Sequence, residues 1–96
     1  MYAVVRRYSG QGAPQLFDDL DRRRAEVEKL IRGVPGFVSY SLFRTAEGGV
    51  SVTVCQDKAG TDNSVQLAAT WIRENLPTSA ASPPQISEGE VILQLR

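Results

Sequence analysis

The segment GFVSYSLFRTAEGGVSVTVCQ, residues 36–56, decides the fold of this chain. Its first half is rich in aromatic and β-branched residues, and its second half alternates valine with small residues, a pattern typical of half-buried strands. The AEGG sequence between the two halves can supply the positive φ angles that a tight hairpin turn needs. We therefore predict two antiparallel strands, residues 36–45 and 50–56, joined by a hairpin in the middle of the chain.

A strand and a helix flank this hairpin on each side. The resulting order, β-α-β-β-α-β, defines the fold class as α+β, a ferredoxin-like sandwich in which two helices cover one face of a four-stranded antiparallel sheet. We expect a single domain over residues 1–96, with the proline-rich residues 77–85 as a surface loop. The other predicted elements are a strand at 2–8, a helix at 14–32, a second helix from the capping residues 61–63 to residue 76, and a last strand at 86–95.

Two helices leave one face of the sheet uncovered, and the residues on that face indicate whether two chains can associate through it. The valines of residues 50–54 are expected to face the helices, so the opposite face is composed of small or apolar residues with few charges. Such a face measures roughly 400 Å², the size of patch that usually marks an interface. We expect a two-fold homodimer through the sheet, the alternative being a monomer with a tolerated open face. The residues expected in the dimer interface are Phe37, Ser39, Ser41, Phe43, Ser51, Thr53 and Cys55.

Composition excludes several classes of function. Eleven basic residues balance eleven acidic ones, and this zero net charge argues against a nucleic-acid partner. The chain has no histidine and one cysteine, Cys55, which excludes Cys/His zinc sites, Ser-His-Asp or Cys-His catalysis and an intrachain disulfide. A lone thiol suits a reducing compartment, and no apolar run reaches the length of a signal peptide or membrane span. We expect a cytoplasmic protein with no metal and no membrane partner.

Several of these stretches together resemble a known family. The sequence VPGFVSY (34–40), the Gly-Gly hairpin, SVTV (51–54) and AATW (68–71) are similar to the antibiotic biosynthesis monooxygenase-like family of dimeric α+β barrels. The resemblance covers nearly the whole chain. It implies a dimer joined through its sheets, and ligands held between the helices and the sheet of each subunit.

The members of this family differ in activity, so the resemblance alone implies several possible activities for this chain. The family contains cofactor-free oxygenases of polyphenolic or quinol substrates, heme-degrading enzymes, and members with no known activity. Trp71 matches a position where heme-degrading relatives carry tryptophan, but those relatives also need a histidine, which this chain lacks. They carry an asparagine at the end of the first strand, where this chain has Arg6, Arg7 and Tyr8. Heme degradation is therefore disfavoured, and no cofactor is expected.

The function indicated is that of a small dimeric monooxygenase-like barrel protein, which binds a small aromatic molecule and acts on it by cofactor-independent oxygenation. The alternatives are a non-catalytic homodimeric binding or structural module, or a regulatory ligand-binding domain. The residue pattern identifies no catalytic residue, and whether the chain is an enzyme stays open. The candidate ligand-binding residues are Tyr40, Trp71, Tyr8 and Arg24, for each of which ordinary core packing or a solvated helix edge is the alternative role.

Overall fold

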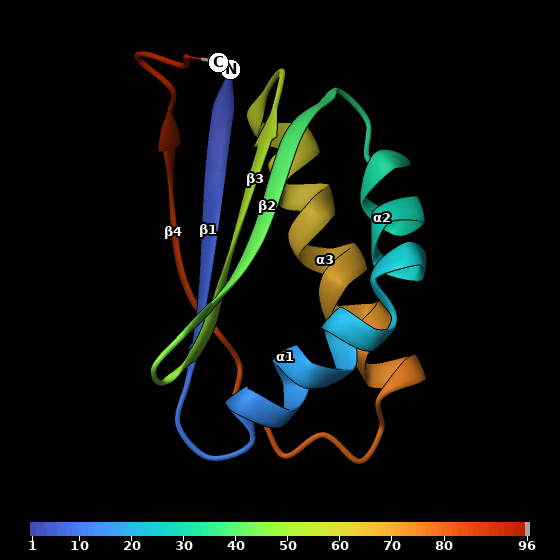
Figure 1. The fold of residues 1–96 in the computed structure, drawn as a ribbon. Helices are drawn as coiled ribbons and strands as arrows, with labels where there is room; N and C mark the ends of the chain where they lie inside the picture. The colour runs from blue at the N-terminus through green and yellow to red at the C-terminus, as the bar shows by residue number, and fades with distance from the viewer. Residues whose placement is uncertain (96) are drawn as a thin grey trace.

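A computed structural model describes residues 1–95 and has a four-stranded antiparallel sheet with all its helices on one face (Figure 1). The strand order is β2-β3-β1-β4, and each neighbouring pair is antiparallel. This confirms the α+β ferredoxin-like fold predicted from the sequence. In the described part of the chain, no helix is long and apolar enough to cross a membrane. The elements are β1 Tyr2–Ser9, α1 Ala13–Arg22, α2 Arg24–Arg32, β2 Phe37–Thr45, β3 Gly48–Cys55, α3 Lys58–Asn75 and β4 Gln85–Glu90.

The first predicted helix is in fact two helices, so three helices pack on the sheet instead of two. The break lies at Arg23, whose φ and ψ of −108° and 28° are not helical. Its guanidinium donates to the main-chain oxygen of Asn75 at 3.1 Å and lies 5.0 Å from the centre of the Trp71 ring. These contacts with α3 hold Arg23 at the point where the chain turns from α1 to α2.

The second predicted helix and the last predicted strand also begin or end at other residues than expected. Helix α3 begins at Lys58, before the predicted capping residues, because the Asp57 carboxylate accepts a hydrogen bond from the Gly60 amide at 3.1 Å. Strand β4 ends at Glu90 instead of continuing to residue 95. The Val91 amide still donates to the Met1 carbonyl, but the side chains of residues 92, 93 and 95 are largely exposed.

The face of β3 that meets the helices is the opposite of the one predicted. Ser51, Thr53 and Cys55 are at most 1% exposed, and the strand register places them beside the buried residues Arg6 and Val4 of β1. Their side of the sheet carries the cluster that packs under the helices, whose buried members are Tyr8, Ala13, Leu16, Phe17, Leu20, Val27 and Ile31. The valines of β3 therefore line the face without helices.

Close packing explains why small residues face the helices. A Cβ atom added to Gly49 would lie 2.2 Å from the Phe17 ring, so only glycine leaves room for α1. A Cβ atom added to Gly60 would lie 2.8 Å from the Cys55 Cβ, so α3 begins almost in contact with β3. Glycine at positions 49 and 60 thus lets α1 and α3 lie directly against the side of β3 that carries Ser51, Thr53 and Cys55.

This reversal changes the set of residues available for an interface. Ser51, Thr53 and Cys55 are buried within the chain and cannot contact a second copy, so the expectation for these three residues was wrong. Phe37 also packs against the cluster under the helices. Three expected residues do share the open face with the valines, since the register pairs Ser39 with Val54, Ser41 with Val52 and Phe43 with Val50.

Candidate functional site

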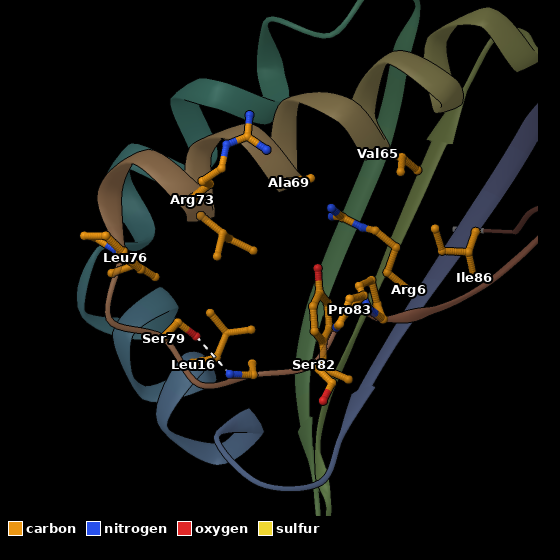
Figure 2. A pocket seen from close by; sticks show the side chains of 15 residues that line it. Arg6, Leu16, Val65, Ala69, Arg73, Leu76, Ser79, Ser82, Pro83 and Ile86 are labelled. Atoms are coloured by element: carbon orange, nitrogen blue, oxygen red, sulfur yellow. Dashed lines mark hydrogen bonds between the residues drawn. The ribbon is translucent and has the colours of Figure 1, made fainter.

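A cavity of about 620 Å³ lies between α3, the start of α1, strands β1 and β4, and the loop that follows α3 (Figure 2). Ligand cavities in proteins typically measure about 300–1,000 Å³, so this one can hold a small molecule. Its surface is mostly apolar. The lining residues are Arg6, Tyr8, Leu16, Val65, Ala69, Ile72, Arg73, Leu76, Pro77, Ser79, Ala81, Ser82, Pro83, Pro84 and Ile86.

One wall is an apolar stripe along α3. Val65, Ala69, Ile72 and Leu76 recur every three or four positions and all line the cavity. The Asp57 cap fixes where this helix begins, and Lys58 ties the same end to β4 through an ion pair with Glu88 at 2.9 Å. The apolar stripe of α3 therefore faces the cavity between α3 and the edge strand β4.

The opposite wall is the proline-rich loop, which the sequence analysis places on the surface without a role. Residues 77–84 cross from α3 to β4 and contribute six of the lining side chains. The loop passes so close to Gly12 that an added Cβ atom would lie 2.6 Å from the Ala80 carbonyl carbon. Gly12 also has a φ of +88°, which favours glycine. Glycine at this position thus lets the loop close on the start of α1.

Arg6 is the principal polar group inside the cavity. Its residue is only 3% exposed, and its Nε donates to the Ser51 Oγ at 2.9 Å. Figure 2 shows the Arg6 side chain extending from the sheet toward α3, across the space between Ala69 and Pro83. Arg73 lines the same cavity from α3 but is exposed. The cavity therefore combines an apolar wall with one buried and one exposed cation.

Two tyrosines lie near Arg6, of which Tyr8 lines the cavity and Tyr40 does not. Tyr8 lines the cavity and packs edge-on against Phe17, with ring centres 5.7 Å apart. Burial raises the pKa of Tyr8, and nearby Arg6 opposes that rise. Burial likewise raises the pKa of Tyr40, again opposed by Arg6. Both phenols are therefore neutral at physiological pH and can donate a hydrogen bond.

The four candidate ligand residues do not converge on one cavity. Tyr8 lines the large cavity, and it also lines, together with Tyr40 and Trp71, a nearly filled void of about 20 Å³. Arg24 lies on the outer side of α2 and pairs with Asp21. It borders a different hollow, of about 330 Å³, between α2 and β2, to which Tyr40 also contributes.

Sequence reasoning missed Arg6 and the loop. The signal for Arg6 was present, because a residue between Val4 and Tyr8 on the same strand face must point toward the helices if those two residues do. No comparable signal marks the loop, since its position depends on the close approach to Gly12. In residues 1–95, no group of three His, Cys, Asp or Glu side chains could hold a metal ion.

Comparisons with known proteins support the fold. No protein-family model and no curated protein matches the sequence. Solved structures do match, among them a protein of unknown function from Nitrosomonas europaea, with 19% identity, a TM-score of 0.71, and 99% of this chain and 91% of that one covered. The cofactor-independent oxygenase SnoaB from Streptomyces nogalater is 21% identical, with a TM-score of 0.65 and coverage of 98% and 95%.

A third match performs different chemistry on the same fold. The heme-degrader MhuD from Mycobacterium tuberculosis, solved with two hemes in its active site, is 18% identical, with a TM-score of 0.58 and full coverage of both chains. At these identities the likeness concerns architecture and leaves the reaction open. The chain has the fold of the antibiotic biosynthesis monooxygenase-like proteins, the family that its sequence resembles.

Proposed function

We propose that this chain binds a small aromatic molecule in the cavity between α3 and the sheet. The observation that carries the proposal is the cavity itself, which joins about 620 Å³ of mostly apolar space to a few convergent polar groups. Flat aromatic rings suit a space bounded by a helix stripe and prolines, and Tyr8 and Arg6 can fix their orientation. The lone thiol favours a reducing compartment, so the proposal includes a cytoplasmic location.

Binding is tested by thermal unfolding with a panel of bicyclic and tricyclic aromatic compounds. A ligand that binds only the folded chain raises its melting temperature. Ala69→Phe places a bulky ring in the cavity from an exposed helix position and should abolish the rise. Gln66→Phe makes the same change on α3 outside the cavity lining and should preserve it. Equal responses of the two variants would place the binding site elsewhere.

The reaction we propose is oxygenation without a cofactor. An electron-rich substrate such as anthrone loses a proton, and its carbanion reacts with molecular oxygen. The CH₂ group becomes a carbonyl, the second oxygen atom leaves as water, and the electrons come from the substrate. The protein's part is to hold the substrate, exclude bulk water and stabilise the anion through Arg6 and Tyr8. SnoaB, with the same fold, is a cofactor-independent oxygenase.

Oxygen uptake with anthrone tests this step. We expect one molecule of oxygen consumed per anthraquinone formed, and a lower rate in Tyr8→Phe. The cavity lining in the described residues contains no Asp, Glu or His, which favours the second candidate function, binding without chemistry. Ligand-induced stabilisation with no oxygen uptake across a panel of anthrones and quinols would establish that second function and refute the oxygenase.

We also propose that two chains associate through the open face of the sheet. This face carries Phe43, which is 49% exposed, beside the partly exposed Val52 and the buried Val50 and Val54. A sheet face that no helix covers and that carries an exposed aromatic ring fits an interface, and a second copy is the commonest partner. Light scattering should give twice the mass of one chain. Val52→Glu would bury a charge at the centre of the contact and should yield monomers, whereas Gln66→Glu on the helix layer should not.

A further inference from the structure

Arg6 is a buried cation without a counter-charge in the described chain. Its Nε donates a hydrogen bond to Ser51 Oγ at 2.9 Å, and the guanidinium also lies within hydrogen-bonding reach of the Tyr40 hydroxyl. No carboxylate oxygen of residues 1–95 lies within 4.0 Å of it, although the arginines in and between α1 and α2 are paired. Buried charges in proteins are normally paired, because removing an ion from water is costly. Arg6 departs from this rule in the lining of the cavity.

None of the neighbouring groups can neutralise it. Burial keeps the pKa of Tyr8 and of Tyr40 above the ordinary value, so neither phenol is ionised near neutral pH. Glu88 lies on the adjacent strand, but it is paired in register with Val4 and its carboxylate binds Lys58 at 2.9 Å. The second charged residue of the lining, Arg73, is also a cation. A chain with zero net charge thus gathers two positive charges around one apolar cavity.

We propose that the cavity takes an aromatic monocarboxylate, with the carboxylate bound by Arg6. This inference rests on the proposed aromatic-binding function and specifies its ligand class. Ser51 and Tyr40 are both uncharged partners that leave the positive charge of Arg6 unbalanced, so the guanidinium can donate short, charge-assisted bonds to a carboxylate. The ring system then lies against the apolar stripe of α3, and Arg73 stands at the side of the cavity exposed to solvent.

The test compares two ligands of the same shape and different charge. Isothermal calorimetry at pH 7 measures the binding of 2-naphthoate and of its uncharged amide, 2-naphthamide. We expect the carboxylate to bind at least about 10-fold more tightly, the effect of one charge-assisted bond in a desolvated site. This comparison uses the unaltered protein, so it does not depend on whether any variant folds.

Two arginine variants then locate the effect. Arg6→Met replaces the buried charge with an apolar chain of similar length, and it should abolish the preference for naphthoate. Arg7→Met is the matched control, since Arg7 is the next residue of β1 but is exposed on the opposite face. It should retain the preference. Without ligand, Arg6→Met should unfold at the same or a higher temperature, whereas a purely structural arginine would lower it.

The outcomes of these experiments distinguish a failure of the carboxylate inference from a failure of the proposed aromatic binding. Equal affinities for naphthoate and naphthamide would overturn the carboxylate inference and leave aromatic binding standing. Absence of binding by both compounds, together with no stabilisation by the wider aromatic panel, would overturn the proposed function and this inference with it. A preference that survives in Arg6→Met but disappears in Arg7→Met would place the anion on the other face of the sheet and refute the assignment to Arg6.

Discussion

The contact between Gly12 and the loop after α3 leads to a sharp prediction, because Gly10 provides a natural control. Both glycines have a φ of +88°. A Cβ atom added to Gly10 meets nothing within 4 Å, whereas one added to Gly12 would lie 2.6 Å from the Ala80 carbonyl carbon and 2.7 Å from the Ala81 nitrogen. Alanine therefore imposes the same backbone strain at both positions, but it displaces the loop at only one.

The magnitudes follow from these two effects. Alanine in the left-handed region costs roughly 1–2 kcal/mol, which is the whole expected loss for Gly10→Ala. Gly12→Ala adds the cost of overpacking against main-chain atoms that cannot rotate away, about 1–3 kcal/mol more. Since Ala81 lines the cavity, the displaced loop also alters the site. We expect Gly12→Ala to lose roughly 2–5 kcal/mol of stability and most of its affinity for aromatic ligands.

Urea unfolding measures the free energies, and calorimetry with the aromatic panel measures binding at a concentration where both variants are folded. The informative quantity is the difference between the variants, because the shared strain cancels. If Gly10→Ala and Gly12→Ala lose the same stability and bind ligand equally well, the loop does not close on Gly12 as described. The cavity wall would then have to be reassigned.

Three further predictions concern other parts of the fold. Gly49→Ala puts a Cβ atom 2.2 Å from the Phe17 ring and should lower the free energy of unfolding in urea by about 1–3 kcal/mol. A second change, Phe17→Leu, should recover part of that stability, and an unchanged stability of Gly49→Ala would disprove the contact. Cys55 is fully buried and burial raises its pKa, so its thiol should react with a disulfide reagent at pH 8 only after denaturation, and rapid reaction in the native state would contradict its placement. Burial also raises the pKa of Tyr8 and of Tyr40 from the ordinary value of 10.0. The folded chain then retains protons that the unfolded chain releases, so these two groups should lower stability as the pH rises above 10 in unfolding curves; a rise there would reverse the sign of the argument.

The topology of the fold was predictable because local signals agree with one another. The alternation of residues 50–55 and the Gly-Gly turn define the central hairpin, and the spacing of Val65, Ala69, Ile72 and Leu76 defines the stripe that lines the cavity. Each of these signals depends only on neighbours in sequence. They were sufficient for the order of elements along the chain and for the fold class, since the flanking helices leave few ways to connect the strands.

The errors lie where distant parts of the chain meet. The break at Arg23 depends on Asn75 and Trp71, which no local pattern connects to it. The face of β3 was assigned by hydrophobicity, but the close approach of Phe17 to Gly49 decides it. Of the candidate site residues, Tyr8 shares the large cavity with Arg6 because both lie on the same face of β1, while Arg24, at the start of α2, borders another hollow.

The three prolines in the cavity wall, Pro77, Pro83 and Pro84, have a consequence for how a ligand is recognised. Each proline ring fixes its own φ angle before any ligand arrives. A flexible wall would lose roughly 1–2 kcal/mol of conformational entropy per residue on becoming ordered around a guest. At these positions that loss has already occurred during folding, so it does not weaken binding. The wall therefore selects ligands by their fit to a fixed outline, and a change of ligand preference calls for a change in the loop's sequence.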